Sequence, residues 1–95
     1  NYLDDKSYYG GQIFYYGEEN KKLAENLQSQ FNKISYPRSI KPMPNIYMYR
    51  RLKITGVLVE CGFISNKKER EKLITPAYQK EIAKSLTEGL ILYFT

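Results

Sequence analysis

A short apolar run that ends in a carboxylate constrains the fold of this chain more than any other feature. Val57, Leu58 and Val59 are consecutive apolar residues, and Glu60 follows them directly. Such a run is typical of a strand that is buried on both faces of a sheet. A carboxylate at the end of that strand costs free energy unless it is solvated, paired or used in chemistry. Because ligand sites of open α/β sheets lie beyond the carboxyl ends of their strands, Glu60 is a candidate site residue. The alternative is a strand-end glutamate that reaches solvent or pairs with a nearby lysine.

The remaining pattern alternates between strand and helix. It predicts a strand over residues 12–16, a helix over 18–32, and strands over 46–49 and 56–60. Residues 35–45 contain three prolines and predict a basic loop. This order is typical of βαβ units, so we expect an α/β fold with a largely parallel sheet and helices on both faces.

Two helix starts close the pattern. Asn66 precedes Glu69 by three residues, which predicts a capped helix that ends near Leu73. Thr75 and Pro76 predict the N-cap and first position of the last helix. Its expected apolar stripe runs at four-residue spacing and consists of Tyr78, Ile82, Leu86, Leu90 and Phe94. Gly89 in the same helix is expected to allow close packing.

The composition limits the chemistry available to the chain. It has no histidine and one cysteine, so it cannot by itself build a histidine-rich metal site or a histidine-activated nucleophile. We expect Cys61 to be a small buried hydrophobic residue. The net charge of +5 suits nucleic acid, an anionic wall polymer or a membrane surface. Lysine and glutamate alternate along the predicted helices, however, which does not favour nucleic-acid binding.

Several segments together resemble one known family. Residues 57–66 read Val-Leu-Val-Glu-Cys-Gly-Phe-Ile-Ser-Asn. They resemble the closing motif of the zinc-dependent N-acetylmuramoyl-L-alanine amidases, which is an apolar strand, Glu, any residue and Gly-Phe-(Leu/Ile)-Ser-Asn. Residues 10–16 look like the family's Gly-Ala-Gln-x-Phe-Tyr-Tyr strand, and residues 47–50 resemble its Tyr-Val-Leu-Arg segment. The details are most similar to the germination-specific amidases of spore-forming bacteria. Thr55 and Gly56 depart from the Pro-Ala that the family often has before this strand.

The resemblance implies that residues 1–95 are the carboxy-terminal half of an amidase catalytic domain, incomplete without the upstream half. It implies zinc-dependent hydrolysis of the amide between N-acetylmuramic acid and L-alanine in peptidoglycan, either of the cell wall or of the spore cortex, and therefore an extracytoplasmic location. The family holds zinc with two histidines and one glutamate, which are expected upstream of this chain. The implied partners are peptidoglycan, the missing amino-terminal half and a regulatory protein, but no nucleic acid.

Three residues are candidates for the site. The resemblance makes Glu60 the catalytic carboxylate, because a carboxylate beside the attacking water can take its proton and pass it to the leaving nitrogen. Gln12 opens its strand near the expected site, where it either contacts substrate or makes hydrogen bonds at the strand edge. Arg50 either binds a carboxylate of the peptide or forms a structural salt bridge. Ser65 and Asn66 are expected to form a helix cap, and Phe63 to pack.

Two other functions compete with the amidase hypothesis. A non-catalytic module that binds peptidoglycan or a partner protein would use the abundant tyrosines and the basic loop over residues 35–45. A basic α/β nucleic-acid binder would show steeply salt-dependent affinity.

Overall fold

The computed structural model describes residues 9–43 and 56–95 of the chain. The predicted strand over 46–49 and Arg50 therefore lie outside the described residues. In chain order, the described elements are β1 (Gln12–Tyr15), the 3-10 helix η3 (Glu18–Asn20), α1 (Lys21–Phe31), β2 (Lys41–Pro42), β3 (Val57–Glu60), α3 (Lys67–Leu73) and α4 (Pro76–Phe94). The fold is of the mixed α/β kind that the pattern predicts.

The three described strands form one sheet in the order β2-β1-β3. β1 and β2, which α1 connects, run parallel as a βαβ unit requires. β1 and β3 pair antiparallel along four positions, from Gln12 opposite Glu60 to Tyr15 opposite Val57. The expectation of a largely parallel sheet is therefore not confirmed. No helix was predicted between residues 35 and 56, and a connection without a crossover helix leaves the chain able to return in the opposite direction.

β2 lies within the segment that the sequence predicts as a loop. Its second residue is Pro42, which cannot donate a backbone hydrogen bond. The sheet order places β2 at an edge of the described sheet, where proline is tolerated. The Met43 amide then donates to the Tyr15 carbonyl over 2.6 Å. Pro42 therefore does not prevent this short strand.

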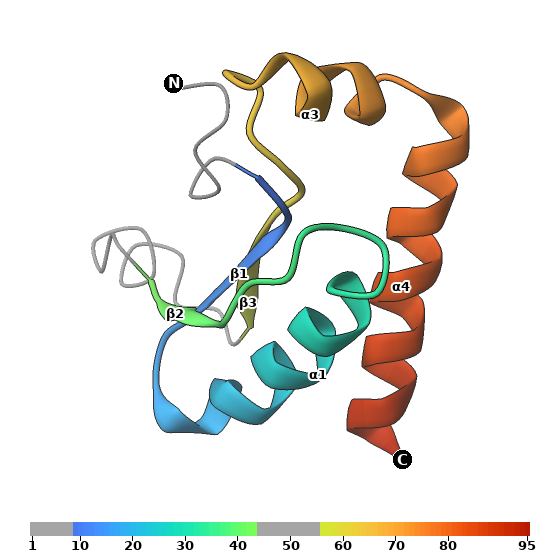
Figure 1. Cartoon of the computed structure of the whole chain (residues 1–95). Helices are drawn as coiled ribbons and strands as arrows, with labels where there is room; N and C mark the ends of the chain where they lie inside the picture. Colours follow the sequence, from blue (N-terminus) through green and yellow to red (C-terminus); the bar gives the residue numbers. More distant parts are fainter. Residues whose placement is uncertain (1–8, 44–55) are drawn as a thin grey trace.

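One side of the sheet carries the core. Ile13 from β1 is fully buried against Ala24 and Leu27 of α1, with Val57 and Val59 of β3 partly buried around them. A second cluster, formed by Phe31, Tyr78 and Ile82, joins α1 to α4. Both long helices lie on the same side of the sheet (Figure 1), so helices on both faces are not confirmed. Leu58, between the two valines, is only partly buried.

The buried face of α4 differs from the predicted stripe in its second half. The buried residues are Tyr78, Ile82, Ser85 and Gly89, whereas Leu90 and Phe94 are 42% and 78% exposed. Steps of four residues advance about 40° around a helix each time, so a stripe with that spacing turns away from its partner. The observed spacing alternates four and three, which keeps the buried face toward α1.

Gly89 allows the close approach of α1 and α4 that the sequence predicts. A Cβ atom at this position would lie 3.0 Å from the Leu27 Cα atom and 3.3 Å from the Asn26 carbonyl oxygen. Because these are backbone atoms of α1, a side chain would push the helices apart.

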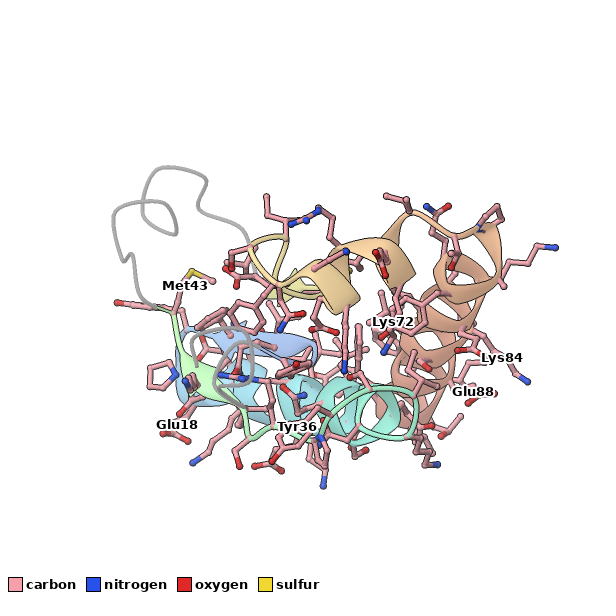
Figure 2. All side chains as sticks on the ribbon, turned by 45° about the horizontal axis from the view of Figure 1, so that its top comes forward. Glu18, Tyr36, Met43, Lys72, Lys84 and Glu88 are labelled. Atoms are coloured by element: carbon pink, nitrogen blue, oxygen red, sulfur yellow. The ribbon has the colours of Figure 1, made fainter. Side chains whose placement is uncertain are left out.

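Charged side chains of both signs lie on the outer surfaces of the helices. Lys84 and Glu88 both project from α4, while Lys72 lies on α3 (Figure 2). No helix within residues 9–43 and 56–95 has both the length and the apolar character needed to span a membrane.

Candidate functional site

Glu60 is the last residue of β3, as the apolar run predicts, and its side chain is exposed. It lies directly opposite Gln12, the first residue of β1. Directly opposed residues of an antiparallel pair place their side chains on the same face of the sheet. The structure therefore brings together two of the three predicted site residues at one end of the sheet. It says nothing of Arg50, which lies outside the described residues.

The Gln12 side chain is only 2% exposed and is held by hydrogen bonds within the chain. Its Nε2 atom donates to the Ile13 carbonyl over 3.0 Å and to the Ser39 carbonyl over 2.7 Å. Its Oε1 atom accepts from Arg38 Nε over 2.8 Å. These contacts match the strand-edge role that the sequence left open, while the substrate contact of Gln12 stays a prediction.

Arg38 is a residue of this site that the sequence reasoning missed. Besides its bond to Gln12, its NH1 group donates to the Tyr9 carbonyl over 3.0 Å. Its guanidinium carbon lies 5.2 Å from the centre of the Phe63 ring, a distance at which a cation is attracted to an aromatic face. The available signal was weak: Arg38 stands in a basic loop, and nothing in its spacing links it to Gln12 or Phe63.

A network of amide side chains fixes the beginning of β1. Gln28 of α1 is 3% exposed. Its Oε1 atom accepts from the Ile13 amide over 2.8 Å, and its Nε2 atom donates to the Gly11 carbonyl over 3.0 Å and to Asn32 Oδ1 over 2.9 Å. Asn32 in turn bonds both backbone groups of Arg38, accepting from its amide over 3.0 Å and donating to its carbonyl over 2.8 Å. α1 thereby connects the start of β1 to the loop that carries Arg38.

The segment after Glu60 ends in the predicted helix cap. Asn66 is 2% exposed, and its Oδ1 atom accepts from the Glu69 amide over 3.2 Å. The Glu69 carboxylate does not complete a reciprocal capping box. It accepts from the Gly10 amide over 2.6 Å instead, and so ties α3 to the residues that precede β1. A Cβ atom at Gly62 would lie 3.1 Å from Leu73 Cδ1 and 3.3 Å from Glu69 Oε1, so a larger residue in the turn after Glu60 would require these side chains to shift slightly.

Cys61 lies beside Glu60 but faces the core. It is half-buried and packs against the cluster of Phe31, Tyr78 and Ile82. Burial raises the pKa of the Cys61 thiol, because the thiolate would lose its solvation. The expected role as a small hydrophobic residue fits, although the burial is only partial.

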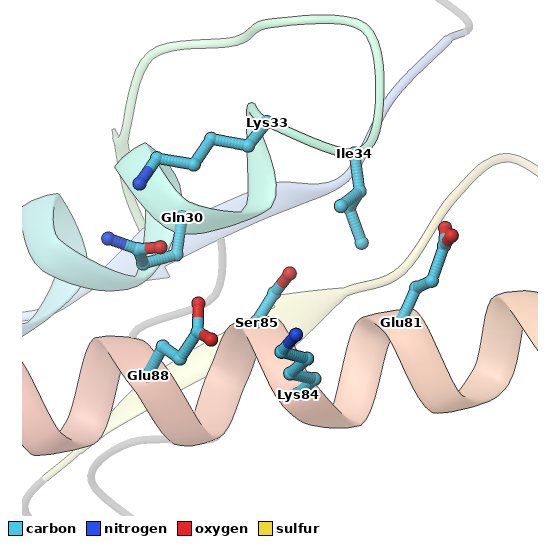
Figure 3. Close-up of a pocket in the computed structure, with 7 residues that line it drawn as sticks. All are labelled: Gln30, Lys33, Ile34, Glu81, Lys84, Ser85 and Glu88. Atoms are coloured by element: carbon cyan, nitrogen blue, oxygen red, sulfur yellow. The ribbon is translucent and has the colours of Figure 1, made fainter.

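Two of the hollows on the surface of the described residues differ in their place relative to the site. The first, of about 330 Å³, adjoins the candidate site and is lined by Gln12, Pro37, Arg38, Ser39 and Lys41. The second, of about 240 Å³, lies between α1 and α4 (Figure 3), and it includes neither Gln12 nor Glu60; its lining residues are Gln30, Lys33, Ile34, Glu81, Lys84, Ser85 and Glu88. The first hollow carries two basic side chains, Arg38 and Lys41, which suits an anionic ligand.

The described residues do not supply a metal site. Within residues 9–43 and 56–95, no three histidine, cysteine, aspartate or glutamate side chains gather closely enough to hold an ion. Glu60 therefore has no metal-binding companions in this part of the chain.

Comparison with known proteins identifies the family to which this arrangement belongs. Residues 1–91 match the family model described as N-acetylmuramoyl-L-alanine amidase. The germination-specific N-acetylmuramoyl-L-alanine amidase of Bacillus subtilis is 35% identical over 99 aligned residues, which cover all of this chain and 42% of that protein. The probable N-acetylmuramoyl-L-alanine amidase AmiB of Haemophilus influenzae is 35% identical over 72 residues, covering 75% of this chain and 17% of that protein.

Solved structures share the fold. The CwlD amidase from Clostridioides difficile, determined in complex with the GerS lipoprotein, superposes with a TM-score of 0.81 at 33% identity. The match covers 96% of this chain and 49% of the CwlD chain. An N-acetylmuramoyl-L-alanine amidase from Clostridium difficile 630 gives a TM-score of 0.82 at 25% identity, covering 96% and 51% of the two chains. The fold is thus that of the amidase catalytic domains. The chain belongs to the N-acetylmuramoyl-L-alanine amidase family, and it spans about half the length of the germination-specific relative and of the two solved amidases.

Proposed function

We propose that the protein containing this chain hydrolyses the amide bond between N-acetylmuramic acid and L-alanine in peptidoglycan. The family match over residues 1–91 and the names of the relatives support this reaction. The observation that carries it in this chain is the position of Glu60. It is an exposed carboxylate at the end of β3, opposite Gln12, which lines a basic hollow, and it stands within the motif that resembles the amidases.

Residues 1–95 form the carboxy-terminal half of the catalytic domain in this proposal. The chain spans 42% of the germination-specific relative and 49% and 51% of the two solved amidases named above, which supports the assignment. The upstream half supplies the parallel strands and the helices for the second face of the sheet. It also holds the zinc ion, since the described residues provide no group of ligands for it.

Glu60 is the proton carrier of the reaction. Its carboxylate accepts a proton from the water that attacks the carbonyl carbon, and it passes this proton to the nitrogen of L-alanine as the carbon–nitrogen bond breaks. The products are a free lactyl carboxyl group and a new amino terminus. The exposure of Glu60 supports this role, because the carboxylate is accessible to a substrate that docks at the end of the sheet.

Substrate binding involves Gln12 and Arg50 in this proposal. Gln12 lines the basic hollow, although its amide is also bonded within the chain. Arg50 binds a stem-peptide carboxylate.

The protein acts outside the cytoplasm, as the relatives named cell wall amidases suggest. The germination-specific relative suggests the spore cortex as the substrate, and the CwlD–GerS complex suggests a lipoprotein as the regulatory partner.

The test uses the longest native polypeptide that contains this segment. It is incubated with purified peptidoglycan, with and without a zinc chelator, and the newly released L-alanine amino termini are counted. We expect release that the chelator abolishes and added zinc restores. Binding to peptidoglycan without any release, by folded protein with bound zinc, would instead favour the non-catalytic wall-binding module.

A further inference from the structure

Arg38 contacts the polypeptide on both sides of the proposed catalytic carboxylate. Its Nε atom donates to Gln12, which is the residue directly opposite Glu60 in the sheet. Its guanidinium also lies over the ring of Phe63, three residues beyond Glu60 in the chain. One side chain thus connects the neighbouring strand to the turn that follows β3.

Arg38 is itself held at its backbone. Asn32 bonds both its amide and its carbonyl, and Gln28 bonds Asn32 from the buried face of α1. A third anchor is the Tyr9 carbonyl, which accepts from the guanidinium. These partners fix where the arginine lies. Because its guanidinium contacts Phe63, a shift of Arg38 would also shift Phe63 and the turn after Glu60.

We propose that Arg38 is a positioning residue, which sets the orientation of Glu60 through Gln12 and Phe63. This inference rests on the proposed amidase function. The planar guanidinium can hydrogen-bond to Gln12 through its edge while its face lies over an aromatic ring, whereas the ammonium of lysine offers no such plane. Displacement of a catalytic group by about 1 Å can cost on the order of 10²-fold in rate. A small shift of the turn after Glu60 therefore has a large effect on turnover.

The experiment compares the wild-type polypeptide, in its longest native form, with its Arg38→Lys variant. Lysine keeps the charge but loses the planar contacts, so we expect kcat to fall roughly 10- to 100-fold, with KM changed less than about threefold. The matched control is Lys72→Met, which removes a cation 4.5 Å from the centre of the Tyr78 ring, outside the Glu60 turn. The control is expected to retain wild-type kcat. A second variant, Phe63→Leu, removes the ring, and the double variant should be little slower than the slower single variant.

The position of the turn is also measured without activity. We expect the backbone amide resonances of Glu60 and Phe63 to move in Arg38→Lys, while resonances in α4 stay in place. Wild-type kcat in Arg38→Lys, or a rise in KM without a fall in kcat, would overturn the inference. If the wild type releases no L-alanine, the proposed function fails, and unmoved Glu60 and Phe63 resonances would separately refute the positioning role.

Discussion

Replacing Gln28 with methionine removes the amide that completes the backbone hydrogen bonding of β1. Gly11, Ile13 and Tyr15 are alternate residues, so their backbone groups point toward the same edge of the strand. At Tyr15 this edge is paired, because the carbonyl accepts from Met43. β2 does not extend to Gly11 and Ile13, and there the Gln28 side chain takes the place of a strand. Methionine fills a similar volume but offers neither the donor nor the acceptor.

The loss can be estimated from the groups left behind. The Ile13 amide and the Gly11 carbonyl both belong to buried residues, and each loses its bond to Gln28. A buried polar group without a partner costs about 1–3 kcal/mol. We expect about 3–4 kcal/mol for the two groups together, because partial access of water lowers the cost at one of them. In a domain of twice this chain's length, that loss lowers Tm by roughly 6–16 °C.

The assay is denaturant and thermal unfolding of the longest native polypeptide. Gln79→Met is the matched control, since Gln79 also donates to a backbone carbonyl, that of Leu73, but at an exposed position. The control is expected to change the free energy of unfolding by less than about 0.5 kcal/mol. Equal destabilisation by the two substitutions would refute the reasoning, because burial of the bonded groups would then make no difference.

Two further predictions concern α4. Gly89→Ala gains about 1 kcal/mol of helix propensity, but its Cβ atom would lie 3.0 Å from Leu27 Cα, and overpacking of this kind costs about 1–3 kcal/mol. We therefore expect chemical unfolding to show that Gly89→Ala lowers the net stability. The control Ala83→Gly, at an exposed position of the same helix, should destabilise through helix propensity alone. Increased stability in Gly89→Ala would contradict the close packing. Burial raises the pKa of Tyr78, and the Glu69 carboxylate raises it further, while the Ser35 hydroxyl lowers it without reaching hydrogen-bond geometry. The folded state therefore holds the phenolic proton more tightly than the unfolded state does. The contribution of this proton to the free energy of unfolding is complete below pH about 10 and declines as the pH rises through the folded-state pKa. Tyr78→Phe should remove that part of the alkaline loss, and an unchanged pH profile of the unfolding free energy would count against the buried hydroxyl.

Local signals in the sequence predicted the elements that depend on neighbouring residues. The apolar run ending at Glu60 gave a strand with the carboxylate at its end. Asn66 and Thr75 cap α3 and α4 through their side chains, as the spacing of Asn66 from Glu69 and the Thr75-Pro76 pair indicated. Each of these features is decided within a few residues, where propensity and capping chemistry suffice.

Contacts between distant segments were not predictable in the same way. The direction of β3 depends on how the chain returns from β2, which no local pattern records. Arg38, Gln28 and Asn32 form the network that supports the site, yet they are separated from their partners by up to 29 residues. Polar residues of this kind are common on surfaces, and only the packing of α1 against the start of β1 makes them structural.

For the site itself, the sequence predicted that Glu60 would lie at a strand end and that Gln12 would lie near it. The register of β1 and β3 places the two opposite each other, but the resemblance to the amidases, rather than any local pattern, suggested their proximity. The extent to which Gln12 is bonded within the chain was not predictable, since the partners Arg38 and Ser39 come from a proline-containing loop.

The most direct test of the central proposal is the rate of L-alanine release by the Glu60→Gln variant of the longest native polypeptide. Glutamine keeps the shape of the side chain but cannot carry the proton, so we expect a fall of about 10²- to 10⁴-fold, with zinc content and Tm unchanged. Glu71→Gln, an exposed position of α3, is the control and should retain wild-type activity. Wild-type activity in Glu60→Gln would contradict the role assigned to this carboxylate.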